Sequence, residues 1–364
     1  MVVALALGGL LVLESALHAQ AWRGTALSLV GIALGYVLFQ STFGFAGSFR
    51  AALERRDFAG FRAQAIALAL TSLVFFPLLA VGTLFGQPLN GFAAPIGVSF
   101  VIGAILFGIG MQIGGGCASG TLFALGGGDG RLLVTLGFFV VGSAIGAAHL
   151  DVWRGLPAFP AVTSQDLLGW PIALLVHLAI FGLIVWAVPP PRDVAPGPLG
   201  VLQRPWSLTQ GAFALAALNS LTLIIAGRPW GETAGFTLWG SKIAAWIGFD
   251  AANWPYWRGD PSALSRSLFD DITTLMDFGI LIGAALAAAS SNRFNFRAGR
   301  PSAWLAACIG GTLMGYGARL SDGCNIGAYF SALASGSLSG WVWVAAAFAG
   351  SAVGLRLRPL FRLG

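Results

Sequence analysis

Apolar runs of about 18 to 25 residues recur along this chain, and a helix of that length crosses the hydrocarbon core of a bilayer. Hydrophobic residues make up 57% of the 364 residues and charged residues only 9%, with a mean hydropathy of +0.81. A soluble globular domain carries about 25% charged residues. Runs such as 63–85 and 132–150 are apolar on every side, whereas a transmembrane barrel alternates apolar and polar residues over strands of about ten. The sequence therefore predicts an all-α polytopic membrane protein and excludes a barrel and a soluble enzyme.

We expect about nine transmembrane helices together with short broken or re-entrant half-helices. Residues 1–13 are apolar without a preceding basic stretch, and His18-Ala19-Gln20-Ala21 only loosely resembles a cleavage site, so we interpret them as a short first membrane segment. The further spans expected are 25–45, 63–85, 98–123, 132–150, 171–188, 207–226, 272–289, 302–320 and 341–355.

Basic residues outnumber acidic ones by 20 to 14, and they gather at the ends of the apolar runs. Cytoplasmic loops of membrane proteins carry an excess of Lys and Arg. This rule places the clusters and the C-terminus in the cytoplasm. Their partner is then the lipid bilayer with its anionic headgroups, and nothing indicates nucleic acid. The clusters are Arg50, Arg55, Arg56 and Arg62, then Arg293, Arg297 and Arg300, and finally Arg356, Arg358 and Arg362.

A proline-rich segment at 189–205 divides the chain into a first half, 1–188, and a second half, 206–364, within one membrane unit. The halves repeat, because 110–123 (GMQIGGGCASGTLF) matches 317–330 (GARLSDGCNIGAYF) at a constant offset of 207 residues. The stretches 40–49 and 227–236 occupy comparable places with weaker identity. We expect each half to carry two broken segments. The arginine clusters make the two cysteine-bearing segments cross in opposite senses, which is typical of inverted repeats with a site near the midplane.

The repeated Gly-Cys motifs are predicted to break their helices. Three consecutive glycines at 114–116 do not extend a helix at low cost, and irregular backbone at membrane depth must line an interior path. Each break leaves free N–H groups at a helix start, and such groups bind anions. The two thiols then favour a soft, sulfur-containing ligand. Candidate binding residues are Cys117 and Cys324, with Gly116, Ser119, Gly323 and Asn325 from the same motifs.

Other interpretations stay open for several residues. The two cysteines could instead be small packing residues, or part of a metal site that lacks enough further ligands to be complete. Cys308 has no partner in the other half, and we interpret it as a packing residue. Arg319 and Asp322 form a mutual ion pair, or Arg319 adds positive potential to an anion path. Arg228 is either an interfacial anchor or part of that path. The polar groups His149, His177 and Asp277 fit packing and helix-end roles better than proton relays.

The paired motifs GGGCASG and DGCNIG, together with GRPWGETAGFTLWG, resemble the YeeE/YedE family of sulfur-transport membrane proteins over nearly the whole chain. The resemblance implies about nine spans plus half-helices in two pseudo-symmetric halves that narrow toward the centre. It implies uptake of thiosulfate through S–H contacts along a line of cysteines, in which Cys117 matches the central thiol and Cys324 the following one. It also makes a TusA-like cytoplasmic sulfurtransferase a plausible partner. No cofactor and no metal are expected.

The sequence departs from that family pattern in the first broken segment, where Gly44 stands at the place of a further thiol. Its backbone N–H, or a hydroxyl of Ser41 or Thr42, still offers a donor there. We therefore expect an inner-membrane thiosulfate transporter, with a sulfur-oxyanion sensor as the alternative and a membrane sulfurtransferase as the least favoured one. No general base or catalytic dyad is recognisable.

Overall fold

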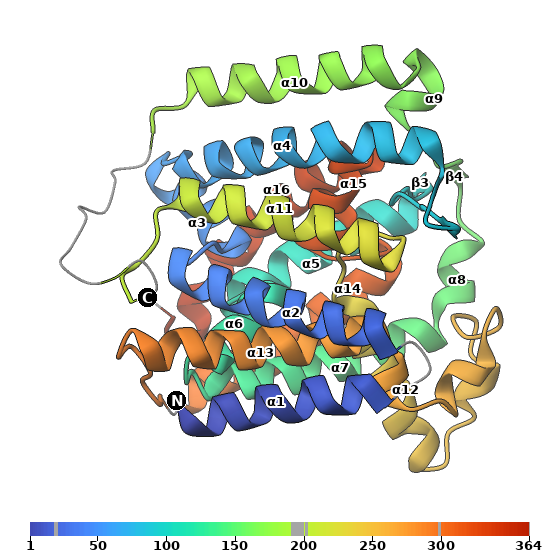
Figure 1. The fold of residues 1–364 in the computed structure, drawn as a ribbon. Coiled ribbons are helices and arrows are strands. Elements are labelled where there is room, and N and C mark those ends of the chain that lie inside the picture. The colour runs from blue at the N-terminus through green and yellow to red at the C-terminus, as the bar shows by residue number, and fades with distance from the viewer. Residues whose placement is uncertain (18–20, 191–199, 201–202, 298–299, 364) are drawn as a thin grey trace.

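The computed structural model describes residues 1–17, 21–190, 200, 203–297 and 300–363, and these residues are almost entirely helical (Figure 1). The described α-helices are α1 (Val2–Leu17), α2 (Ala21–Ser41), α3 (Phe45–Arg55), α4 (Ala59–Val81), α5 (Val98–Gly114), α6 (Ala118–Gly126), α7 (Arg131–Ala148), α8 (Leu150–Arg154), α9 (Ser164–Leu168), α10 (Trp170–Ala187), α11 (Leu208–Ala226), α12 (Thr233–Trp246), α13 (Ile272–Ser290), α14 (Pro301–Leu320), α15 (Ala332–Ala334) and α16 (Ser339–Leu357).

The shorter elements lie in the loops and breaks between these helices. Two strand pairs, β1 with β2 and β3 with β4, are antiparallel and two residues long. Their bounds, with those of the π-helical turn η4 and of the 3-10 turns, are β1 (Thr83–Leu84), β2 (Gln87–Pro88), β3 (Ile96–Gly97), β4 (Ala158–Phe159), η1 (Ala251–Asn253), η2 (Pro261–Leu264), η3 (Leu268–Asp270), η4 (Asn325–Ser331) and η5 (Arg358–Phe361).

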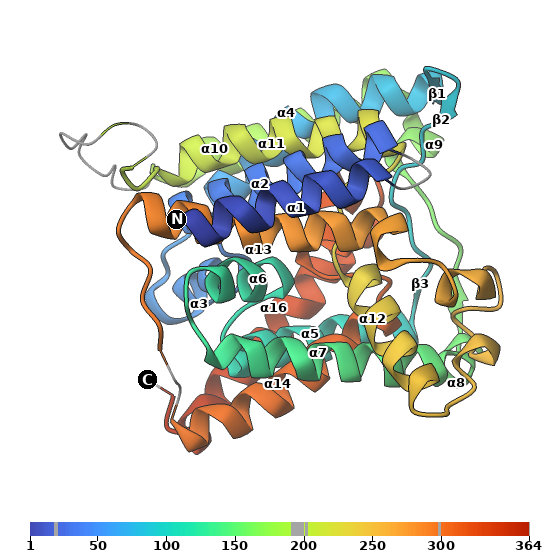
Figure 2. The ribbon, with the colours of Figure 1, turned by 60° about the horizontal axis from the view of Figure 1, so that its bottom comes forward.

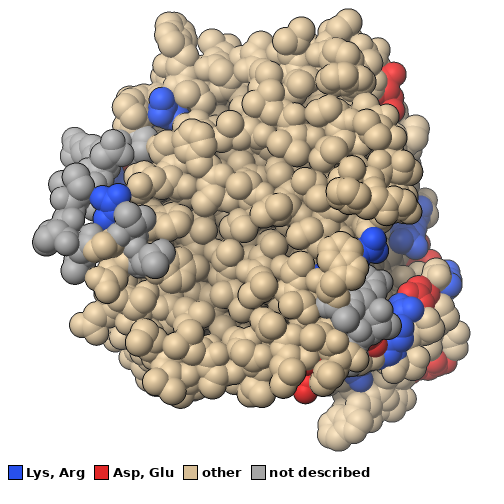
Figure 3. All heavy atoms as spheres, viewed as in Figure 1, with Lys and Arg blue, Asp and Glu red and all other residues tan. Residues whose placement is uncertain are grey.

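The all-α polytopic membrane fold predicted from the sequence is confirmed. In the described chain, eight helical segments are long and apolar enough to cross a membrane, and two of them continue from one helix into the next, at 22–55 and 98–126. On the face in Figure 3, charged side chains lie toward the two ends of the molecule and uncharged ones fill the wide band between. Such a surface suits a hydrocarbon core bounded by two aqueous faces.

The two halves of the sequence interleave. Helix α2 packs along α13, α5 packs on α14 and α16, and α7 packs on α14. Glycines let these helices approach closely, since a Cβ at Gly35 would lie 2.0 Å from the Ile280 carbonyl oxygen and one at Gly283 only 1.9 Å from that of Ile32. Small residues at such contacts are typical of helix association in membranes. Much of the glycine excess therefore serves packing as well as helix breaks.

Four breaks interrupt helices, two in each half, as the sequence predicts. They lie between α2 and α3, α5 and α6, α11 and α12, and α14 and η4. Two predicted spans differ from the structure for local reasons. The span predicted at 63–85 ends at Val81, because Gly82 adopts a left-handed conformation with φ +77°. The span predicted at 98–123 divides into two helices at Gly115, which is left-handed with φ +92°. Left-handed backbone terminates a helix and favours glycine.

Helices α5 and α14, which precede Cys117 and Cys324, lie side by side and run in opposite directions. The Ser99 hydroxyl, near the start of α5, donates to the Leu320 carbonyl at the end of α14 over 3.1 Å, and Gly110 meets Gly310 further along. This is the crossing sense expected from the arginine clusters, while the repeat relation of the complete halves stays a prediction. Most of the predicted linker, at 191–199 and 201–202, and the loose cleavage site at 18–20 lie outside the described residues.

Both chain ends and the connections α3–α4 and α13–α14 lie at the same end of the molecule (Figure 1). We call this the arginine end, because it contains the three arginine clusters of the sequence. The connections through β3 and α8, and the segment after α12, lie at the opposite end, as the rotated view also shows (Figure 2). The four breaks bring short helices into the interior between these two ends.

Candidate functional site

The starts of four short helical segments meet in the interior, and each segment is preceded by a capping residue. The caps are Gly44 before α3, Cys117 before α6, Glu232 before α12 and Cys324 before η4. The Ala46 amide of α3 lies against the Cys117 thiol, and the Cys324 thiol contacts the Glu232 carboxyl. Free N–H groups at helix starts carry partial positive charge, so this arrangement concentrates donors around the two thiols.

The first thiol sits at the glycine break between α5 and α6. After Gly115 turns left-handed, Cys117 is extended and caps α6, and its Sγ accepts the Gly120 N–H over 3.4 Å. The Ser119 hydroxyl lies 3.4 Å from the same sulfur, and Cys117 is 1% exposed. The predicted break is present, and it places a buried thiol at a helix start.

The second thiol sits at the matching break after α14. Asp322 has a left-handed φ of +56°, and Cys324 then caps the π-helical turn η4 with its Sγ accepting the Ile326 N–H over 3.4 Å. The Cys324 thiol also donates to Oε2 of Glu232 over 3.8 Å. Short π-helical turns inside helices frequently mark functional sites.

Glu232 is a site residue that the sequence interpretation missed. Its side chain is 1% exposed, the Ser119 N–H lies against its carboxyl, and it interacts electrostatically with Cys117 as well. One of its oxygens, Oε1, has no hydrogen-bond partner in the described structure. An acidic residue inside an otherwise apolar membrane segment is a functional candidate on its own, and that signal was present in the GRPWGET stretch.

Several buried donors near this centre also lack partners within the described residues. They are the Asn325 side-chain amide, Nε1 of Trp230 and Nε of Arg319, on side chains that are 0%, 1% and 5% exposed. The large majority of buried polar groups in proteins are hydrogen-bonded, and leaving one unpaired costs about 1–3 kcal/mol. A ligand with several oxygen acceptors would satisfy donors of this kind.

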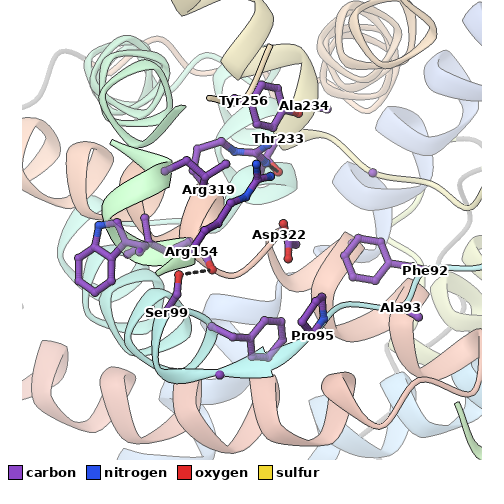
Figure 4. Close-up of a pocket in the computed structure, with 18 of the residues that line it drawn as sticks. Phe92, Ala93, Pro95, Ser99, Arg154, Thr233, Ala234, Tyr256, Arg319 and Asp322 are labelled. Atoms are coloured by element: carbon purple, nitrogen blue, oxygen red, sulfur yellow. Dashed lines mark hydrogen bonds between the residues drawn. The ribbon is translucent and has the colours of Figure 1, made fainter. Parts of the chain in front are cut away.

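A cavity of about 800 Å³ lies on the side opposite the arginine end, and Figure 4 shows part of its lining. It reaches Glu232 and Gly323, which adjoin Cys324. Its walls include Trp230, Glu232, Gly323 and Gly327, whereas Cys117 and Cys324 lie behind this lining. Three arginines line it, namely Arg154, Arg228 and Arg319, and sequence reasoning did not single out the first. The cavity thus presents positive charge to an incoming ligand and has Glu232 between that ligand and Cys324.

Two of these arginines are held in place by neutral partners. Arg319 donates to the Thr233 hydroxyl over 2.9 Å, and its guanidinium lies 5.1 Å from the centre of the Tyr256 ring. Arg228 donates to the Thr273 hydroxyl over 2.8 Å. No ion pair joins Arg319 to Asp322 among the described residues, although both line the cavity (Figure 4). Arg319 extends toward α12 instead, so it interacts with Asp322 electrostatically but without the direct ion pair considered from the sequence.

On the far side of Cys117, arginines approach the end of α5 from the arginine end. Arg50 donates to Oε1 of Gln112 over 3.3 Å, Arg358 donates to the Gln112 carbonyl over 2.8 Å, and Arg131 lies against Gly115. Gln112 is fully buried, and its amide donates to the Ala46 carbonyl over 3.2 Å. Gln112, the counterpart of Arg319 in the first repeat, thus links α3, α5 and the arginines.

The remaining candidates fall outside this centre. Cys308 is a half-buried residue of α14 and His177 packs among aromatic rings with Nε2 3.2 Å from the Ser164 hydroxyl. Asp277 is different, because it is fully buried and neither carboxyl oxygen has a partner in the described residues. Among the residues that the structure describes, no group of three or more His, Cys, Asp or Glu side chains is arranged to hold a metal ion.

Comparison with known proteins agrees with this architecture. Residues 40–353 match the family model described as sulphur transport. The chain belongs to this family. It is 30% identical over 344 residues to the thiosulfate transporter TsuA of Spirochaeta thermophila, covering 88% of this chain and 94% of that protein. It is 26% identical to the thiosulfate transporter TsuA of Escherichia coli, covering 86% and 88%, and 32% identical to its probable transporter YedE, covering 43% and 40%.

Proposed function

We propose that this member of the sulphur transport family takes up thiosulfate across the bacterial inner membrane, along a central path past Cys324 and Cys117. The observation that carries the proposal is the meeting of two buried thiols with four helix starts and unpartnered donors. The names of two relatives that align over most of their length, both thiosulfate transporters, support the choice of ligand. Family and names favour transport over catalysis.

Thiosulfate combines two kinds of atom that this centre suits. Its oxygens are hydrogen-bond acceptors that match N–H donors such as those of Asn325, Trp230 and Arg319. Its terminal sulfur is soft and polarizable, as is the thiol sulfur. Each cysteine Sγ already accepts an N–H from its own helix, so its S–H is the group that can donate to the anion. The Cys324 S–H must leave Glu232 to do so. A thiol hydrogen bond is weak, which favours passage over tight retention.

The proposed path runs from the large cavity to the arginine end. Arg154, Arg228 and Arg319 attract the dianion into the cavity, and it passes Glu232 to reach the thiols. Arg50, Arg131 and Arg358 lie beyond Cys117 and provide the next positive charges. We place the arginine end, with the C-terminus, in the cytoplasm, because the arginine clusters obey the positive-inside rule in that orientation.

At Gly44 the proposed path has no side chain that could bind the anion. This glycine caps α3 beside Cys117, and a Cβ added there would meet only the Thr42 carbonyl oxygen, at 3.9 Å. The α3 backbone N–H groups are the donors at this point in place of a thiol. Release toward the arginine end thus depends on amides and arginines.

The test is uptake of radiolabelled thiosulfate into proteoliposomes, compared with sulfate, which has the same charge but no terminal sulfur. The wild type is expected to take up thiosulfate well in excess of sulfate. Serine is the matched substitution, since it caps a helix at least as well as cysteine, so C117S and C324S preserve the fold and remove the soft donor. Thiosulfate uptake that survives in C117A/C324A would refute the thiol path. Thiosulfate binding without uptake would favour a sensor instead.

We also propose that a TusA-like sulfurtransferase receives the anion at the arginine end. The support is the family resemblance of the sequence together with the exposed arginines at 55 and 56, which suit an acidic docking surface. Photo-crosslinking from residue 56 in membranes, followed by mass spectrometry, tests this partner. Crosslinks to lipid alone would contradict it.

A further inference from the structure

Glu232 separates the cavity from the thiol pair, and the thiol path alone does not account for it. The residue lines the cavity, and its Oε2 accepts the Cys324 S–H over 3.8 Å. Its Oε1 has no partner in the described structure, and the side chain is 1% exposed. An anion that moves from the cavity to Cys324 must therefore pass directly beside this carboxyl.

No cation in the described residues neutralises Glu232. Arg319 of α14 donates to Thr233 and Arg228 of the α11–α12 connection donates to Thr273, and neither forms an ion pair with it. Two further titratable groups line its cavity, Arg154 of α8 and Tyr256 of the segment after α12. The remaining ones that interact with it or share its cavity are acids or thiols: Asp277 of α13, Asp322 and Cys324 of the α14–η4 break, and Cys117 of the α5–α6 break.

In the absence of the anion, the carboxylate has donors that favour its charged form. The Cys324 S–H and the Ser119 N–H both lie against it, and Arg228 and Arg319 share its cavity. Hydrogen bonds to a charged form stabilise that form. Burial favours the neutral acid instead, so these donors leave Glu232 poised between its neutral and its charged form.

A dianion beside Glu232 shifts this balance toward the neutral acid. Two like charges in a buried site of low dielectric repel strongly, so the doubly charged ligand favours the neutral acid. Protonation at Oε1 then turns the unpartnered oxygen into an O–H donor toward the anion. Because binding linkage is reciprocal, a ligand that favours the protonated site is itself bound better when the proton is present.

Resting on the proposed function, we infer that Glu232 couples thiosulfate uptake to protons, with one proton carried inward for each dianion. The O–H bond forms at Oε1 with a proton from hydronium of the outer solution as the anion binds. It breaks when the anion has moved past Cys117, and the proton follows the anion through the α5–α6 break to water on the arginine side. Each cycle moves one dianion and one proton, a net single negative charge.

The decisive measurement is accumulation of thiosulfate in proteoliposomes under a pH gradient, acidic outside, with the membrane potential clamped by potassium and valinomycin. Thiosulfate stays a dianion throughout this range, so the gradient acts on the protein. With one proton per anion, a gradient of about one unit supports up to roughly tenfold accumulation in the wild type. E232Q, whose amide keeps a donor and cannot release a proton, is expected to equilibrate thiosulfate without accumulating it. E14Q, an exposed Glu-to-Gln change in α1, should accumulate as the wild type does.

The possible failures are distinguishable. A wild type that carries no thiosulfate at all overturns the proposed function. A wild type that equilibrates thiosulfate but gains nothing from the gradient overturns the proton coupling only. If E232Q proves inactive in flux, calorimetry of thiosulfate binding in buffers of different ionisation enthalpy decides the matter. About one proton taken up per anion by the wild type and none by E232Q supports the inference; equal uptake by both overturns the assignment to Glu232 and points to Asp277.

Discussion

Replacing Gly283 by alanine tests whether close helix contact holds the interior breaks in place. An added Cβ at this residue of α13 would lie 1.9 Å from the Ile32 carbonyl oxygen and 2.7 Å from its carbon. Ordinary van der Waals contact begins near 3.4 Å, so α2 and α13 must part by roughly 1.5 Å. Overpacking of this kind costs about 1–3 kcal/mol, partly offset by the better helix propensity of alanine, by up to about 1 kcal/mol.

Gly182→Ala is the matched control, because Gly182 lies in the middle of α10 and a Cβ added there would have no other atom within 4 Å. That change should leave stability unaltered or raise it by up to about 1 kcal/mol. The assay is unfolding of the purified protein in mild detergent with increasing dodecyl sulfate, followed by tryptophan fluorescence. The G283A midpoint should fall well below those of the wild type and G182A. Equal midpoints for the two alanine variants would refute the steric reasoning.

Two further changes address the path itself. Arg319→Lys should raise the KM for thiosulfate by about tenfold, or about 1.4 kcal/mol, because lysine does not reproduce the planar contacts with Thr233 and Tyr256. The KM is measured from uptake at increasing thiosulfate concentration. An unchanged KM would show that Arg319 does not meet the anion. Gly44→Cys should raise the maximal uptake rate severalfold, since the Cβ has room there and a thiol adds a donor beside Cys117; a rate equal to that of the wild type would mean that the α3 amides already suffice.

The sequence predicts the fold class and the four breaks because both follow from strong local signals. Apolar runs of membrane length leave no other fold, and the glycines before Cys117 oppose a continuous helix whatever surrounds them. The opposite crossing of α5 and α14 follows from the arginine clusters at the ends of the apolar runs. These features depend on the conformational preferences of the backbone and on which segments avoid water, and both can be judged from the residue types alone.

The sequence does not reveal which side chains share the interior. Arg319 and Asp322 are three residues apart and invite pairing, but the helix ends at Leu320 and Asp322 turns left-handed, so their spacing on a helix no longer applies. Glu232 meets Cys324 only because α12 and η4 start at the same point, a contact across 92 residues of sequence. Arg154 reaches the cavity from α8 in the same manner. Such contacts arise from tertiary packing alone.

The position of the four capping residues has a consequence for how such a scaffold changes its ligand. Gly44, Cys117, Glu232 and Cys324 each precede a helix whose remaining turns pack against the rest of the molecule. The backbone amides at these starts serve any anion alike, whatever side chains follow. On the proposed path, chemical preference is therefore concentrated in four positions: Gly44 has no side chain, Cys117 and Cys324 are soft, and Glu232 is acidic. We expect that exchanging these four alone retunes the molecule for another anion while its helices remain unaltered.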